Sequence, residues 1–189
     1  TVLLLASSCE KWLDVKPDDE VYIEDALVDR QGFTQALSGI YTGLAKPTLY
    51  GRNLEYGMLD AMAGYWKVPS TNDFYELFKF DYGKPNAQDT LTKIWSGLYT
   101  NIRQCNFLLA HMDNIAKDPY YNLIKGEALG LRAFLHLEAF KLFGPVVKVK
   151  GLETESLPYY LMATKVPQKF LSSAAFLNQV ETDLQEAKL

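Results

Sequence analysis

Apolar residues recur at steps of three and four positions in several stretches of the chain, the spacing that puts side chains on one face of an α-helix. The first of these stretches predicts a helix that begins near Asp25 and ends before Pro47. Its apolar stripe consists of Phe33, Leu37, Ile40 and Leu44. A shorter helical stretch follows, marked by Leu54, Met58, Leu59 and Met62.

The clearest helical patterns lie in the middle of the chain and predict two long helices. The stripe of the first is Ile94, Leu98, Ile102, Cys105, Leu109 and Met112. The second runs from about Pro119 to Phe143, with a stripe of Ile124, Ala128, Leu131, Leu135, Ala139 and Leu142. Gly144 and Pro145 should end it, because Gly is favoured just past a helix end and Pro cannot continue a helix. The short link at 114–118 predicts that the two helices pack as an antiparallel hairpin.

The last part of the chain predicts a further helix after a mixed connection. Residues 146–149 are compatible with a short extended piece, and 150–169, with two prolines, predict an irregular connection. The last helix should begin at Ser172 or Ser173, since either hydroxyl can cap its first turn. Its predicted buried stripe is Phe176, Val180 and Leu184. Stacked helix pairs of this kind predict an all-α fold of tetratricopeptide-like helical hairpins, with the character of an α-solenoid.

Residues 63–89 interrupt the helical spacing and combine turn-forming residues with aromatic side chains. The turn formers are Gly64, Pro69, Gly83 and Pro85. The aromatic residues are Tyr65, Trp66, Phe74, Tyr75, Phe78, Phe80 and Tyr82. A loop of this length in a compact domain is usually functional or disordered, and its aromatic content argues against disorder. The segment is therefore predicted to be a long, ordered aromatic loop.

The two ends of the chain carry patterns of incomplete segments. Residues 1–8 are an apolar run that precedes Cys9 without an initiator Met or a basic segment, which is typical of the tail of a secretory leader. The chain stops at Leu189 inside an amphipathic pattern, without the Gly, Asn or Pro that usually closes a helix. We therefore expect a chain incomplete at both ends, divided into a leader (1–9), a polar tether (10–21) and a helical domain (22–189).

Composition narrows the functional classes. The chain has 189 residues, 48% of them hydrophobic, which is enough to bury the core of one compact domain. A net charge of −4, with both signs spread along the chain, gives no basic surface for a phosphate backbone, so nucleic acid is not an expected partner. Two cysteines are too few for a disulfide framework or a thiolate zinc site. No cofactor or metal site is predicted.

An ordered set of short motifs carries a family resemblance. After Cys9 the motifs are WLDVKP at 12–17, ALSGIYTGL at 36–44, IWSGLY at 94–99, GEA at 126–128, LRAF at 131–134 and LFGP at 142–145. Together they resemble the amino-terminal region of the SusD/RagB outer-membrane nutrient-binding lipoproteins. The resemblance implies a surface-exposed, lipid-anchored protein with tetratricopeptide-like helices. It also implies a lid on a TonB-dependent outer-membrane transporter, to which the protein delivers glycans, and a further region after this segment.

Cys9 is the predicted lipidation site. It follows Ala6-Ser7-Ser8, small residues that give a signal peptidase access to the bond, and long acyl chains on its thiol would anchor the protein without a spanning helix. Leu5 lies one place further from the cysteine than the usual lipoprotein pattern has it. The alternative is an ordinary free or disulfide-paired cysteine.

The aromatic loop is the predicted ligand site. Flat aromatic rings offer sugar C–H faces a large contact area, and amides or carboxylates nearby can pair with hydroxyl groups. The predicted ligand-binding residues are Tyr65, Trp66, Asn72, Asp73, Phe74 and Tyr75. The alternative is that these aromatic residues pack the loop onto the helices or face the transporter. Trp95, by its helical phase beside Ile94 and Leu98, is predicted to be a core residue.

The remaining reactive side chains are interpreted as structural. Cys105 lies in an apolar stripe, where a free thiol usually behaves as a small hydrophobe. His136 is predicted to be a packed helix residue, while Glu127 and Arg132 fit a solvated helix face or an ion pair between helices. The chain carries no recognisable catalytic motif, and the protein is predicted not to be an enzyme. The alternative to glycan binding is a tetratricopeptide-like scaffold that binds a partner protein.

Overall fold

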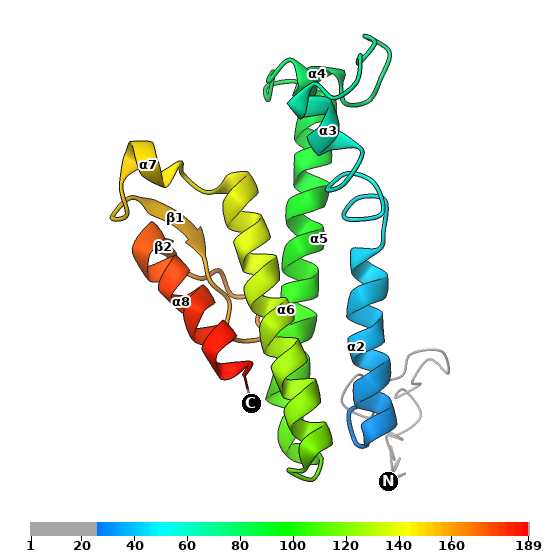
Figure 1. Cartoon of the computed structure of the whole chain (residues 1–189), viewed down its shortest axis with the longest axis vertical. Coiled ribbons are helices and arrows are strands. Elements are labelled where there is room, and N and C mark those ends of the chain that lie inside the picture. Colours follow the sequence, from blue (N-terminus) through cyan, green and yellow to red (C-terminus); the bar gives the residue numbers. More distant parts are fainter. Residues whose placement is uncertain (1–25, 189) are drawn as a thin grey trace, which may run out of the picture.

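The structure is a computed structural model, and it describes residues 26–188 (Figure 1). The helices are α2 (Arg30–Leu44), α3 (Met58–Ala63), α4 (Tyr75–Phe78), α5 (Pro85–Ala110), the 3₁₀ turn η2 (Met112–Asn114), α6 (Pro119–Phe143), α7 (Val147–Lys150) and α8 (Ser173–Glu186). The strands β1 (Glu155–Pro158) and β2 (Phe170–Ser172) form one antiparallel sheet. The predicted helical fold is confirmed, with this small sheet as an addition that the sequence pattern did not predict.

Three long helices form the body of the molecule. Figure 1 shows α2, α5 and α6 running along its long axis, with α8 packed against α6 and the small sheet beside α8. The α5–α6 hairpin is confirmed, and α6 has the predicted bounds. Asp118 caps α6 by accepting hydrogen bonds from the amides of Tyr120 and Tyr121, at 2.9 and 3.1 Å.

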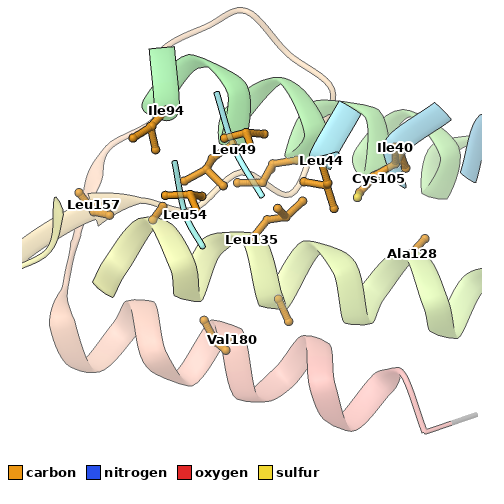
Figure 2. Close-up of a cluster of buried hydrophobic side chains, with 14 of the residues drawn as sticks. Ile40, Leu44, Leu49, Leu54, Ile94, Cys105, Ala128, Leu135, Leu157 and Val180 are labelled. Atoms are coloured by element: carbon orange, nitrogen blue, oxygen red, sulfur yellow. The ribbon is translucent and has the colours of Figure 1, made fainter. Parts of the chain in front are cut away.

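The core lies between α2, α5 and α6. Figure 2 shows Ile40 and Leu44 of α2 together with Ile94 and Cys105 of α5, and Leu135 of α6 in the same cluster. The segment after α2 adds the buried side chains Leu49 and Leu54. The helix α2 begins at Arg30, later than predicted, because the Asp29 side chain caps it by accepting the Gly32 amide hydrogen at 2.8 Å.

Three predictions about the connections need correction. The aromatic loop is shorter than residues 63–89, because α4 forms within it and α5 already begins at Pro85, whose fixed φ and missing N–H suit the first position of a helix. Residues 147–150 form the single helical turn α7 and not an extended piece, since the Val146 carbonyl accepts the amides of Val149 and Lys150 at 2.9 Å. The connection that follows is not wholly irregular, because pairing with the distant β2 orders β1.

A buried ion pair joins α8 to α6. The Arg132 guanidinium donates from Nε and Nη2 to the two carboxylate oxygens of Asp183, each at 2.7 Å, and both side chains are buried. Tyr159 donates a third hydrogen bond to Asp183 at 2.6 Å. This pair confirms the interpretation of Arg132 as an inter-helix partner. It also corrects the predicted stripe of α8, because Asp183 is 1% exposed whereas Leu184 is 44% exposed.

His136 lies at the centre of this polar cluster. Its ring stacks on Tyr159, with centroids 3.6 Å apart. Its Nδ1 lies 2.9 Å from the Arg132 carbonyl oxygen, and its Nε2 accepts the Tyr160 amide hydrogen at 3.1 Å. A neutral imidazole with its proton on Nδ1 satisfies both contacts. Burial lowers the pKa of His136 to about 3. The hydrogen bond to the Arg132 carbonyl oxygen opposes this shift, and the positive charge of the Arg132 guanidinium adds to it. The prediction of a packed histidine is confirmed.

The low pKa of His136 should make the fold sensitive to acid. The unfolded chain takes up a proton on this imidazole below about pH 6.5, whereas the folded protein does not until about pH 3. The stability linked to His136 is therefore fully present above about pH 6.5. As the pH is lowered from there toward 3, the unfolding constant rises by about tenfold per pH unit. Urea unfolding at pH 7, 6, 5 and 4 should show a shallower decline in His136→Gln than in wild type. Equal slopes in the two proteins would contradict the assignment.

Cys105 is buried as predicted, whereas Trp95 is only partly buried. Cys105 is fully buried in the core, and desolvation raises the pKa of its thiol to about 12, so the structural interpretation is confirmed. Trp95 is only half-buried, packed against Tyr99 and the edge of Phe143. Its prediction as a core residue was therefore wrong in part, because one side of this α5 face borders a hollow and not another helix.

No helix within residues 26–188 is long and apolar enough to cross a membrane. The predicted leader, the lipidation site Cys9 and the tether at 10–21 lie outside the described residues.

Candidate functional site

The predicted aromatic loop lies at one end of the bundle, where α3 and α4 sit at the start of α5 (Figure 1). The helix α3 ends at Gly64, which adopts the left-handed conformation with φ of +74°. A residue with a side chain would be strained there, so this glycine permits the sharp turn that starts the loop.

Tyr65 is the most exposed of the predicted aromatic ligand residues. Its side chain is 80% exposed, yet its amide donates a hydrogen bond to the Asp60 carbonyl oxygen at 3.0 Å. The backbone below the ring is therefore fixed while the ring faces solvent. Trp66 is half-buried and packs partly against the core, so it can offer only part of its indole to a ligand.

The other four predicted residues differ in how far they are exposed to solvent. Asn72 uses its side-chain oxygen to accept the Phe74 amide hydrogen at 2.9 Å, which closes a turn. Asp73 is exposed, and Tyr75 is half-buried against Phe78. Phe74 is buried in the core, so its ring packs the loop onto the bundle as the alternative interpretation proposed. The structure thus buries only Phe74 of the predicted residues: Tyr65 and Asp73 are exposed, and Trp66, Asn72 and Tyr75 keep part of their surface accessible.

A polar hollow of about 260 Å³ lies beside this loop. Its polar lining includes Arg52, Asn53, Asp73, Asn86, Asp89 and Lys93. Of these, only Asp73 is among the ligand residues predicted from the sequence. Asn86, Asp89 and Lys93 follow Pro85 at the spacing of one helix face, but the prediction of a loop over residues 63–89 obscures this signal.

The charges of the polar hollow are arranged as donors beside acceptors. Arg52 donates from Nε to the Asn53 side-chain oxygen at 3.1 Å, and its guanidinium lies 5.2 Å from the centre of the Phe74 ring. Lys93 forms an exposed ion pair with Asp89 at 2.6 Å. No ion pair involves Asp73 within residues 26–188, so its carboxylate can accept hydrogen bonds from a ligand. Such a set of cations, amides and carboxylates suits a ligand rich in hydroxyl groups.

The described residues also bear on metal binding. Within 26–188, no group of three or more His, Cys, Asp or Glu side chains is placed to hold a metal ion.

Glu127 accepts a hydrogen bond from the Tyr41 hydroxyl at 2.6 Å, across α2 and α6. Desolvation first and this contact second raise the pKa of Tyr41 to about 12. Glu127 therefore joins two helices, as the inter-helix interpretation proposed.

Comparison with known proteins identifies the family of this chain. The model of a SusD-like family, described as starch-binding and associating with the outer membrane, matches residues 11–189. No curated protein sequence matches the chain.

Solved structures share the fold. A SusD-like carbohydrate-binding protein from Bacteroides vulgatus superposes with a TM-score of 0.69 at 24% identity, over 84% of this chain and 35% of its own. A SusD superfamily protein from Bacteroides thetaiotaomicron gives a TM-score of 0.68 at 21% identity, over 85% of this chain and 37% of its own. The chain thus spans little more than a third of the length of these structures.

Proposed function

This chain belongs to the SusD-like family, and we propose on that premise that the protein binds oligosaccharides at the outer-membrane surface without catalysing a reaction. The observation that carries the proposal is the exposed Tyr65 ring on a fixed backbone, in the same loop that contributes Asp73 to the polar hollow. Because the backbone is already fixed, only the few side-chain torsions of Tyr65 lose freedom when a sugar stacks on its ring.

In this proposal the two parts of the site have separate tasks. The C–H face of a sugar ring packs on Tyr65 and on the accessible part of Trp66. The hydroxyl groups of the same or the next ring reach donors on Arg52 and Lys93 and the acceptor on Asp73. Stacking gives contact area, and the paired hydrogen bonds fix which hydroxyl groups fit.

The effect of removing the ring tests the site. We expect Tyr65→Ala to weaken binding of the best glycan by about fivefold or more, on the order of 1 kcal/mol for a lost aromatic contact. The measurement is calorimetry against a panel of neutral and acidic polysaccharides, preceded by affinity electrophoresis. Phe170→Ala removes an exposed ring from β2 at a distance from the loop and serves as the control. Unchanged affinity in Tyr65→Ala would exclude this loop as the site.

Anchoring and delivery are the other parts of the proposal. The protein would be held at the surface by acyl chains on Cys9 and would pass sugar to a TonB-dependent transporter. Each buried methylene contributes about 0.8 kcal/mol to membrane binding, so several chains suffice for stable attachment. Mass spectrometry of protein extracted from membranes should find a lipid-modified Cys9, and an unmodified cysteine would contradict the anchor.

One observation favours the alternative function, a scaffold that binds a partner protein. Several large apolar side chains are exposed on the segment from α7 to β2, among them Val146, Val149, Leu152, Leu161, Val166 and Phe170. Clustered exposed apolar residues are typical of protein interfaces. Failure of every glycan to bind, together with transporter binding that Phe170→Ala weakens, would favour this alternative.

A further inference from the structure

A second hollow lies on the middle of α5, away from the aromatic loop. It has a volume of about 350 Å³, in the size range of small-molecule sites. One wall is the α5 face that carries Trp95, Tyr99 and Arg103, and the opposite wall is the segment after β1 that contains Tyr160. The hollow shares no lining residue with the polar hollow beside the loop.

The aromatic wall of this hollow is rigid. Trp95 packs against Tyr99 with ring centroids 4.5 Å apart, and the Tyr99 and Tyr160 rings meet in a T-shaped arrangement with centroids 5.6 Å apart. The Tyr99 hydroxyl donates to the Pro158 carbonyl oxygen at 3.1 Å. These contacts fix both rings, so a ligand would meet a surface that is already formed.

The buried polar cluster supports the same wall from behind. Arg132 donates to the Asn106 side-chain oxygen at 2.8 Å, and Asn106 in turn donates to the carbonyl oxygens of Tyr160 and Met162, at 2.8 and 3.3 Å. The segment after β1 is therefore tied to the hairpin by side chains that are themselves held. Such support is what a binding surface needs to keep its geometry.

The described side chains that line the α5 hollow are either positively charged or neutral. Among the described residues, Arg103 is the one charged side chain that lines it, and none of those lining residues is a carboxylate. Within residues 26–188, Arg103 takes part in no ion pair, and it is exposed. The hydroxyl groups of Ser96 and Thr100 lie on the same helix face and add donors and acceptors. A guanidinium fork next to flat rings and hydroxyl groups matches a carboxylate on a hydroxylated ring.

We infer that this α5 hollow is a second sugar site, selective for an acidic sugar such as a uronic acid. The sugar ring stacks on Trp95, and its carboxylate pairs with Arg103. This inference rests on the proposed function and names the class of glycan that one of its sites takes.

The test compares an acidic and a neutral ligand of the same size. Calorimetry of the whole chain should show that a galacturonic acid trisaccharide binds up to about fivefold more tightly than a galactose trisaccharide, since an exposed charged pair contributes about 1 kcal/mol at most. Arg103→Gln should remove this difference, and Arg30→Gln, the same charge change on exposed α2 surface, should keep it. The Trp95 indole N–H resonance, assigned by its loss in Trp95→Phe, should shift on titration.

The possible failures separate the two proposals. If the acidic trisaccharide does not bind, or binds Arg103→Gln as well as wild type, the second site is wrong, while neutral glycan binding that depends on Tyr65 would leave the proposed function intact. If no glycan binds at all, both are wrong. Self-association that Arg103→Gln weakens would show that the hollow belongs to a protein interface, which also overturns the inference.

Discussion

Replacing Asp183 with Asn should lower the free energy of unfolding by about 3–5 kcal/mol, the loss typical of breaking a buried ion pair by removing one partner. The Arg132 guanidinium would keep its buried position without a counter-charge, and the Tyr159 hydroxyl would lose a charged acceptor. Urea unfolding followed by circular dichroism gives the measurement.

An exposed pair on α5 provides the matched control for this prediction. Asp89 and Lys93 are 2.6 Å apart, as close as Arg132 and Asp183, but their side chains are more than half exposed. We expect Asp89→Asn to cost about 0–1 kcal/mol, because solvent screens such a pair. The double variant Arg132→Met with Asp183→Leu should recover much of the loss, since neither charge is then left alone. An equal cost for Asp183→Asn and Asp89→Asn would refute the claim that the buried pair holds α8.

Truncation of Phe176 should be similarly severe. Its ring is completely buried in α8, with centroids 5.2 Å from both Phe140 and Tyr159. Phe176→Ala should therefore cost about 3–5 kcal/mol, the usual range for a buried aromatic replaced by Ala. The same urea experiment on Phe170→Ala should show a change of at most about 0.5 kcal/mol, because that ring is 54% exposed. A small effect at Phe176 would mean that the cluster collapses around the lost ring.

Together the two predictions describe how α8 is attached. Its contact with α6 consists of an apolar half around Phe176 and a polar half around Asp183. Apolar contact provides affinity but tolerates sliding, whereas a two-point hydrogen bond fits one position only. Both halves are needed for α8 to keep its register on α6.

The long helices could be predicted from the sequence because their signals are local. The bounds of α6 follow from Pro119 at its first position, Gly144 after its last residue and an apolar stripe between them. The onset of α8 follows in the same way from the cap at Ser172. Each signal lies within a few residues of the feature that it determines.

Features that depend on distant partners could not be predicted. The burial of Asp183 in place of Leu184 depends on Arg132, which comes from a different helix. The small sheet exists only because β1 meets β2, and the α5 hollow needs Tyr160 opposite Tyr99. The spacing of residues along one segment carries no information about its contacts with distant segments.

Within the aromatic loop, composition predicted the type of residue but not its exposure. Tyr65 and Phe74 belong to the same short segment, yet one ring faces solvent and the other lies in the core. What separates them is the turn at Gly64 and the turn closed by Asn72, which direct the two rings differently. Whether Tyr65, Trp66 and Asp73 bind sugar stays a prediction for the variants described above.

The burial of the Arg132–Asp183 pair also determines how the protein responds to dissolved salt. Mobile ions screen charges that water reaches but have little access to a pair enclosed by protein. The attachment of α8 is therefore expected to be insensitive to ionic strength, whereas the proposed pairing of a ligand carboxylate with the exposed Arg103 is expected to weaken as salt is added. A concentrated salt wash would strip an acidic ligand from α5 and leave the helices that hold it in place.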